Sequence, residues 1–157
     1  PIVLILHADQ QLERNVLNRV RQTMNNEQIN GGCVGSTFES LERGQWIIHV
    51  LNIFRARIMG ISFGDQGQFF RRSIWKREQW SLDMPLMEDV ELSILLNNLT
   101  GRVCYLGGGL ISSVRRWQEK NRVLNAIEII KFVLTYCLLR RFTKEVDTWS
   151  MYKRYYG

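Results

Sequence analysis

Three short groups of polar residues in this sequence carry side chains that could do chemistry. The first, His7-Ala8-Asp9, directly follows the apolar run 1–6. A continuous apolar run of this length is typical of a buried central strand, and open α/β sheets bind ligands at the carboxyl ends of their strands. A carboxylate there suits a divalent cation such as Mg²⁺, which proteins commonly hold with one or two carboxylates plus substrate phosphates. Asp9 is explained equally well as the N-cap of a following helix.

The second group is acidic and lies at the start of a predicted helix. Glu88, Asp89 and Glu91 follow Pro85, which fixes the entry of the chain. A carboxylate in this position could take a proton from a hydroxyl group that attacks an electrophilic carbon. Acidic side chains at a helix N-terminus are also stabilised by the helix dipole, by about 0.3–1 kcal/mol. Three such residues are more than helix capping requires. Their spacing alone is compatible with both a catalytic base and a purely structural role.

The third group is basic and contains one aromatic ring. Arg115 and Arg116 precede Trp117. Two guanidinium groups can neutralise a leaving diphosphate through bidentate, charge-assisted hydrogen bonds, with the indole ring as a platform. A solvated basic turn anchored by one tryptophan explains the same residues.

Alternating strands and helices must position these groups. The spacing of the apolar residues predicts an α/β sandwich with a mainly parallel sheet. Gly60 is the expected stop of the second helix. The predicted elements are a strand over 1–6, a helix over 12–24, a strand over 33–38, a helix over 46–58, a loop running into a strand over 64–72, a short helix over 73–77, a helix over 88–99, strands over 102–106 and 110–114, and a helix over 123–139.

The last of these helices is almost entirely apolar. It has 17 residues, and Glu128 and Lys131 interrupt it, whereas a membrane-spanning helix needs about 20 residues with few charges. The pattern favours a core helix or a dimer interface. The alternative is an interfacial helix that rests on a membrane, with Arg140 and Arg141 at the headgroups.

Composition places the chain among ordinary globular domains. With 157 residues, 45% hydrophobic and 23% charged, it has the size of a single domain and is not a disordered chain. Lys and Arg outnumber Asp and Glu by 21 to 15, so an anionic partner is expected. Three well-separated cysteines, Cys33, Cys104 and Cys137, predict reduced thiols in the cytoplasm rather than disulfides or a zinc site. The opening residues have no charged leader, so they indicate a strand rather than a signal peptide.

Taken in order, the motifs resemble the family 2 glycosyltransferases of the GT-A fold, and within them the bacterial subgroup of radical-SAM/selenodomain-associated transferases. The family carries a Leu-His-Ala-Asp strand end, a Gly-Asp-Gln-Gly block followed by a strand and Arg-Arg, a Pro-Leu-Met-Glu-Asp-Val-Glu-Leu block, and Ser-x-Arg-Arg-Trp before an apolar helix. The corresponding segments of this sequence are Leu6–Asp9, Phe63–Gly67, Arg71-Arg72, Pro85–Leu92 and Ser113–Trp117.

The resemblance implies a mixed sheet flanked by helices and an inverting, metal-dependent transfer of a sugar from a nucleotide-diphosphate sugar to an acceptor hydroxyl. Asp9, with His7 beside it, would hold Mg²⁺ or Mn²⁺ against the donor diphosphate. Asp89 would be the general base, and Glu88 would support it or contact the acceptor.

The remaining family motifs are implied to bind substrate. Asp65 and Gln66 stand where the family lines the sugar or acceptor pocket. Arg115, Arg116 and Trp117 match the motif that contacts the diphosphate and the acceptor.

Two departures from the family pattern shape the hypotheses. His7 stands where many relatives have a first Asp, and the nucleotide-binding half that opens the family's fold is absent ahead of residue 1. The chain is therefore predicted to be the acceptor-side, C-terminal half of a glycosyltransferase, cytoplasmic or bound to the cytoplasmic face of the membrane. The alternative is a truncated, non-catalytic remnant that acts as a homodimeric interaction module. Nucleic-acid binding is disfavoured, because the arginines are scattered and no recognised motif is present.

Overall fold

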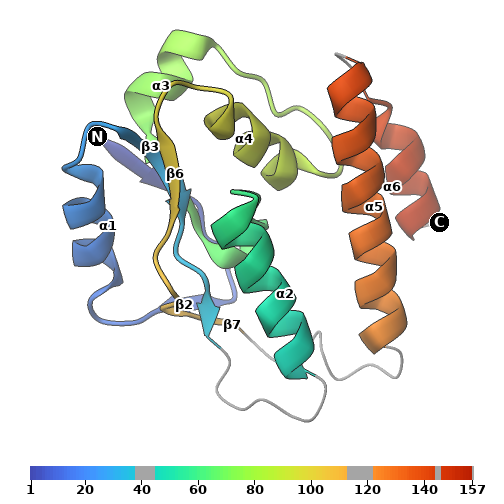
Figure 1. The fold of residues 1–157 in the computed structure, drawn as a ribbon, viewed down its shortest axis with the longest axis horizontal. Helices are drawn as coiled ribbons and strands as arrows, with labels where there is room; N and C mark the ends of the chain where they lie inside the picture. The colour runs from blue at the N-terminus through green and yellow to red at the C-terminus, as the bar shows by residue number, and fades with distance from the viewer. Residues whose placement is uncertain (38–44, 113–121, 144–145, 157) are drawn as a thin grey trace.

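The computed structural model describes residues 1–37, 45–112, 122–143 and 146–156, and it has an α/β fold (Figure 1). The larger sheet contains four strands in the order β1-β5-β3-β6. Strand β5 runs antiparallel to both of its neighbours, whereas β3 and β6 are parallel. The strands are β1 (Ile2–Leu4), β3 (Ile29–Cys33), β5 (Gln68–Arg71) and β6 (Arg102–Tyr105).

A smaller sheet lies beyond the carboxyl end of β3 (Figure 1). Its three strands follow the order β2-β7-β4, with β2 antiparallel and β4 parallel to β7. They are β2 (Gln10–Leu12), β4 (Ser36–Thr37) and β7 (Leu110–Ser112).

Helices cover both faces of the larger sheet. Successive side chains of a strand point to opposite faces, and Phe69 of β5 packs against Val20 of α1, whereas Phe70 packs against Leu92 of α4. The described helices are α1 (Val16–Met24), α2 (Gln45–Ile58), α3 (Arg72–Glu78), α4 (Glu88–Asn97), α5 (Arg122–Phe142) and α6 (Thr148–Tyr156). The predicted α/β fold with a mixed sheet flanked by helices is therefore confirmed.

The glycine pair of β3 lets three strands approach closely. A Cβ on Gly32 would lie 1.9 Å from the carbonyl oxygen of Cys104, and one on Gly31 would lie 2.4 Å from that of Phe69. Side chains at these two positions would therefore collide with the backbones of β6 and β5. The predicted strand over 33–38 is therefore displaced, because β3 ends at Cys33 and only Ser36–Thr37 follow it as β4.

Helix α5 is attached to α4 by an apolar cluster and by a buried acid. Val133 and Tyr136 of α5 pack with Val90 of α4. Glu91 accepts hydrogen bonds from the Tyr136 hydroxyl at 2.7 Å and from Nη2 of Arg140 at 2.9 Å. Within the described part of the chain, none of the helices has the length and hydropathy that crossing a bilayer requires.

The N-terminal segment differs from the prediction. Strand β1 lies at the edge of its sheet rather than at the centre, and Leu6 is 39% exposed. Residues 10–12 pair with β7 as β2, so α1 begins at Val16 and the N-cap position belongs to Asn15. Asp9 therefore lies in a turn between two strands, and the prediction that it caps a helix is wrong.

One further expectation about the fold was wrong, and one helix was missed. The strands are not mainly parallel, because three of the five pairings among the described residues are antiparallel. The sequence pattern also gave no indication of α6, which packs Met151 into the cluster beneath α5. This helix is rich in polar and aromatic residues and has no regular spacing of aliphatic residues, so a search for apolar periodicity does not detect it.

Candidate functional site

Asp89 is held at the first turn of α4 by backbone groups from two segments. Its Oδ2 accepts a hydrogen bond from the Gly64 N–H at 2.7 Å, and its Oδ1 accepts one from the Val90 N–H at 2.7 Å. The residue before the helix, Met87, has φ 69°, a left-handed conformation that is uncommon for a residue other than glycine. The carboxylate is thus fixed in orientation, while each oxygen retains a lone pair for a further donor.

His7 and Asp89, which are remote in the sequence, meet at Gly64. A Cβ added to Gly64 would lie 2.7 Å from Nε2 of His7 and 3.7 Å from Oδ2 of Asp89. Gly64 begins the 3₁₀ turn η1 (Gly64–Gln66), which precedes β5. The structure therefore brings together the turn after β1, the Gly-Asp-Gln turn and the start of α4.

Gln10 fastens the turn after β1 to η1. Its Oε1 accepts a hydrogen bond from the His7 N–H at 3.0 Å, and its Nε2 donates to the Asp65 carbonyl at 2.6 Å. The Ser36 hydroxyl donates to the same carbonyl at 2.9 Å. Asp9 lies between His7 and Gln10 in this turn and is exposed to solvent.

Gln68 links β5 to the start of α4. Its side-chain Nε2 donates to the Asp89 carbonyl at 2.8 Å and to the hydroxyls of Ser62 and Ser93 at 3.0 Å each. The Gln68 side chain is 2% exposed. A buried, multiply bonded amide of this kind restricts the movement of the groups it bridges.

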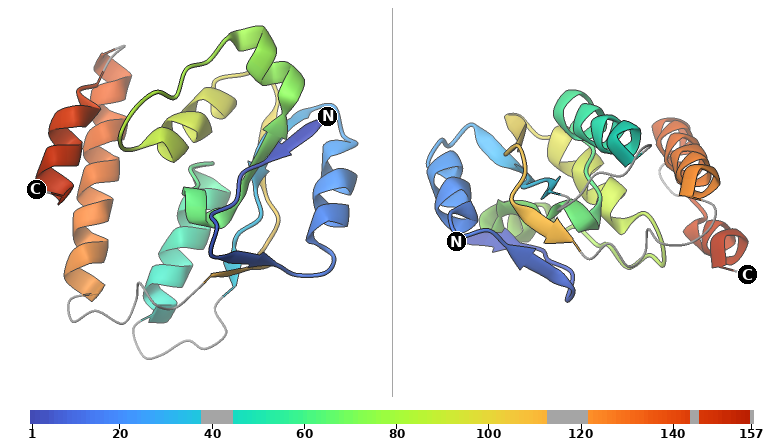
Figure 2. Two further views of the ribbon diagram at one scale, coloured as in Figure 1. Left: turned by 180° about the vertical axis from the view of Figure 1, so that it is seen from behind. Right: turned by 90° about the horizontal axis from the view of Figure 1, so that it is seen from below.

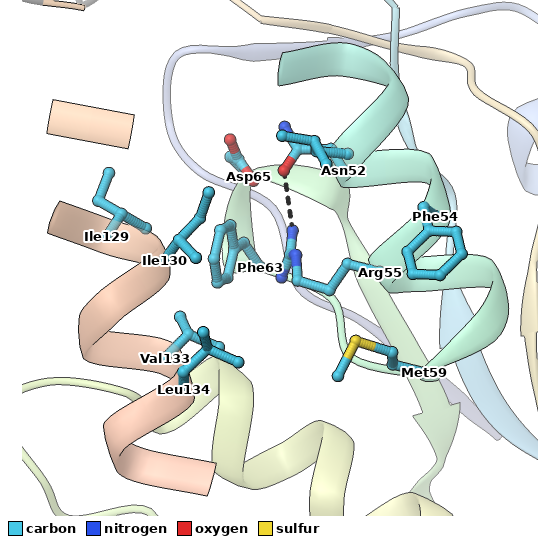
Figure 3. Close-up of a pocket in the computed structure, with 11 residues that line it drawn as sticks. Asn52, Phe54, Arg55, Met59, Phe63, Asp65, Ile129, Ile130, Val133 and Leu134 are labelled. Atoms are coloured by element: carbon cyan, nitrogen blue, oxygen red, sulfur yellow. Dashed lines mark hydrogen bonds between the residues drawn. The ribbon is translucent and has the colours of Figure 1, made fainter. Parts of the chain in front are cut away.

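Arg55 of α2 is a central charged group that the sequence analysis did not single out. Its Nη2 donates to Oε1 of Gln66 at 2.9 Å, and its guanidinium lies 3.3 Å from the centroid of the Phe63 ring. Figure 3 shows the Arg55 side chain extending from α2 to Phe63 and Asn52. The signal for it was an arginine directly after an apolar position of the helical run 46–58, which alone does not distinguish a site from a solvated charge.

Gln66 has its side chain inside the protein. It is 3% exposed, and its Oε1 accepts hydrogen bonds from Arg55 and from the Phe63 N–H, the latter at 3.0 Å. Gln66 thus orients Arg55, and its contact with a substrate stays a prediction.

Burial shifts the protonation equilibria of the two central groups in the same direction, toward the neutral form. Desolvation raises the pKa of Asp89, with smaller contributions from repulsion by Glu88 and Asp65, while the hydrogen bonds from Gly64 and Val90 lower it. Desolvation lowers the pKa of Arg55 to about 10, although attraction to Asp65 and Asp89 opposes this. Asp89 therefore holds a proton more strongly than an exposed carboxylate does.

Two neighbouring pockets open on this cluster. The first, of about 240 Å³, lies between α2 and α5 and is lined largely by apolar side chains, with Arg55 and Asp65 among them (Figure 3). The second, of about 190 Å³, is lined by Glu88 and Asp89 together with aromatic residues of α6. Phe63, Ile129 and Val133 line both pockets, so the two pockets share a wall.

Glu91 has a structural environment that separates it from its two acidic neighbours. It is 5% exposed and bonded to Tyr136 and Arg140, whereas Glu88 is exposed and lines the second pocket. The acidic motif thus divides into one residue that attaches α5 and two that face a pocket.

A cation site would depend on few protein ligands. Among the described residues, no three His, Cys, Asp or Glu side chains are grouped so that they could hold a metal ion. Asp9 and His7 supply a carboxylate and an imidazole in one exposed turn. Divalent-cation binding by these two residues, with substrate phosphates as further ligands, stays a prediction.

The basic motif Arg115-Arg116-Trp117 falls outside the described residues, so its predicted role stays a prediction. No protein-family model, no curated protein and no solved structure matches this chain.

Proposed function

We propose that this chain forms the acceptor side of an inverting glycosyltransferase that uses a nucleotide-diphosphate sugar. The observation that supports this most is the meeting of His7, in the turn after β1, with Asp89, at the start of α4, over the Gly64 backbone. A sheet-end turn suited to a cation then lies next to a fixed carboxylate of raised pKa. The motif resemblance to family 2 glycosyltransferases of the GT-A fold is the second support.

The proposed reaction is a single displacement at the anomeric carbon of the donor. Asp89 takes the proton of the acceptor hydroxyl while the hydroxyl oxygen forms the new bond to the anomeric carbon. The bond from that carbon to the diphosphate breaks at the same time, and its electron pair leaves with the diphosphate. A carboxylate whose pKa is raised by burial is a better base for this step than an exposed one. Glu88, in the same pocket, contacts the acceptor.

The departing diphosphate needs positive charge. Asp9 and His7 are the residues that would hold Mg²⁺ or Mn²⁺, and such a cation stabilises the charge that develops on the leaving oxygen. Arg115 and Arg116 would bind the diphosphate, with Trp117 beside them. Asp65 would contact the sugar or acceptor from the pocket that it shares with Arg55.

The binding test is calorimetric titration with UDP- and GDP-sugars in the presence of Mn²⁺. The resemblance implies a nucleotide-binding half ahead of residue 1, so the titration is made on this chain and on one extended upstream. We expect the extended chain to bind and Asp9→Ala to weaken binding, with Asp83→Ala, an exposed acid in the loop before α4, unchanged. Unchanged binding in Asp9→Ala would refute the metal role.

The catalytic test is turnover of the extended chain with Asp89→Asn. Loss of a general base typically lowers the rate by about 10²–10⁴-fold, and we expect donor binding to persist. Asp83→Asn is the matched control. Turnover at the unmodified rate in Asp89→Asn would show that another group accepts the proton.

The position of β1 favours one alternative function. β1 pairs only with β5 among the described strands, and Ile2, Ile5 and Leu6 are each 37–39% exposed. An unpaired strand edge is a template for another chain, so a homodimeric, non-catalytic module is the second candidate. Light scattering distinguishes the two, because a monodisperse monomer contradicts the homodimer.

A further inference from the structure

Helices α2 and α5 present apolar side chains to solvent on one face of the molecule. The apolar stripe of an amphipathic helix ordinarily faces the core. Here, however, each of eight large apolar side chains is at least 42% exposed. Figure 2 shows, in its right panel, that α2 and α5 lie on the same side of the fold. The residues of this α2–α5 face are Trp46, Val50, Phe54, Ile58, Ile127, Ile130, Leu134 and Leu138.

The pocket between the helices joins the two rows into one surface. Phe54 of α2 and Ile130 and Leu134 of α5 belong to the exposed face and also line the 240 Å³ pocket (Figure 3). Apolar patches that continue into a groove mark interaction sites more often than isolated exposed residues do. The pocket therefore forms a furrow between the two exposed rows, and side chains of both rows line it.

Cationic side chains accompany the apolar rows. Arg57 follows Phe54 by three residues on α2. On α5, Lys131 precedes Leu134 by three residues, and Arg141 follows Leu134 by seven. These spacings put each cation on the same helix face as its apolar neighbour, and all three are exposed. The α2 segment contains no acidic residue, and α5 contains one, Glu128.

This charge distribution selects among the partners that an apolar face can take. In a symmetric pair of chains, both copies would contribute Arg57, Lys131 and Arg141 to one interface, with a single acid per α5 to balance them, and an excess of like charge in an interface is repulsive. An anionic lipid surface complements the same cations while it accepts the apolar side chains.

We propose that the α2–α5 face docks on an anionic lipid bilayer, with its apolar side chains in the headgroup–acyl boundary and Arg57, Lys131 and Arg141 on the lipid phosphates. The chain then lies on the membrane, and the furrow between α2 and α5 opens toward the lipid. Phe63, Arg55 and Asp65 line this furrow, so the docked face directs the apolar pocket at the bilayer. The proposal does not depend on sugar transfer.

The experiment is flotation of the chain with vesicles of phosphatidylglycerol and phosphatidylethanolamine, and with vesicles of phosphatidylcholine. The double variant Phe54→Glu/Leu134→Glu places two acids on the face, where each replaced side chain is 55% exposed. Leu17→Glu, at a side chain of 49% exposure on α1, is the matched control. Circular dichroism and thermal melting confirm that each variant is folded.

We expect the unmodified chain to float with the anionic vesicles and much less with phosphatidylcholine. We expect Phe54→Glu/Leu134→Glu to lower the bound fraction by about tenfold or more, because it removes apolar contact and adds repulsion, and Leu17→Glu to leave it unchanged. A triple change of Arg57, Lys131 and Arg141 to Gln should weaken binding to the anionic vesicles and reduce its salt dependence.

Other results overturn the proposal. Absence of binding by the unmodified chain would refute it directly, as would equal losses in Phe54→Glu/Leu134→Glu and Leu17→Glu. A dimer in light scattering that Leu134→Glu dissociates, without vesicle binding, would assign the face to a second copy instead. A chain that binds vesicles but fails to transfer sugar would leave the docking established and refute only the proposed reaction.

Discussion

The ion pair that attaches α5 should respond asymmetrically to loss of its two partners. Glu91 has 7% of its side chain exposed and Arg140 has 26%. If Glu91 is changed to Gln, Arg140 can turn toward water, and the cost is that of weakened hydrogen bonds, about 1–2 kcal/mol. If Arg140 is changed to Met, a buried carboxylate keeps only the Tyr136 hydroxyl as a partner, and uncompensated buried charges cost about 3–5 kcal/mol.

Urea unfolding followed by circular dichroism measures both changes. We expect the free energy of unfolding to fall by about 2 kcal/mol more in Arg140→Met than in Glu91→Gln, as the difference between these two penalties. The double variant Glu91→Leu/Arg140→Met should recover much of the loss, because a hydrophobic replacement of a buried ion pair is often neutral or stabilising. An equal loss in the two single variants, or a double variant less stable than Arg140→Met, would refute this account.

Three further predictions concern the candidate site and the thiols. Gly64→Ala should displace the His7 imidazole, because the new methyl group would lie 2.7 Å from its Nε2; we expect turnover of the extended chain to fall by about tenfold or more with the melting temperature nearly unchanged. The raised pKa of Asp89 means that its carboxyl stabilises the folded state at acid pH and that this contribution is lost as pH rises through the folded pKa. In thermal melts at a series of pH values, this loss of stability with rising pH should be absent from Asp89→Asn. Finally, burial raises the pKa of Cys33 to about 12 and that of Cys104 to about 11. Iodoacetamide should therefore alkylate both thiols slowly in the folded chain and quickly in denaturant, as measured by mass spectrometry. Rapid alkylation of the folded chain would contradict this.

Local signals in the sequence predicted the elements that carry the acidic site. Pro85 and the acids after it mark the start of α4, and the apolar spacing over 46–58 matches α2 closely. The left-handed glycine after α2, Gly60 with φ 66°, ends the helix as expected. These features depend on interactions between residues a few positions apart, which a sequence displays directly.

Pairing between distant segments could not be predicted in the same way. Leu12 fits the helical spacing of α1, yet its backbone pairs with β7 instead. The run at 2–6 is as apolar as a central strand, but β1, which it contains, has one neighbour, β5, among the described strands. Likewise, nothing local indicates that Glu91 turns inward to Tyr136 and Arg140 while Glu88 faces a pocket, because both partners of Glu91 lie on a helix more than forty residues away.

Turn η1 supports both chemical groups of the candidate site. Its first N–H holds the Asp89 carboxylate, and the carbonyl of its second residue holds the loop that carries His7 through Gln10. A displacement of this short segment would therefore move the Asp89 carboxylate and the turn that carries His7 together. The walls of the two pockets, by contrast, come from α2, α5 and α6, so substitutions there can reshape the pockets without touching the turn that ties the two groups together.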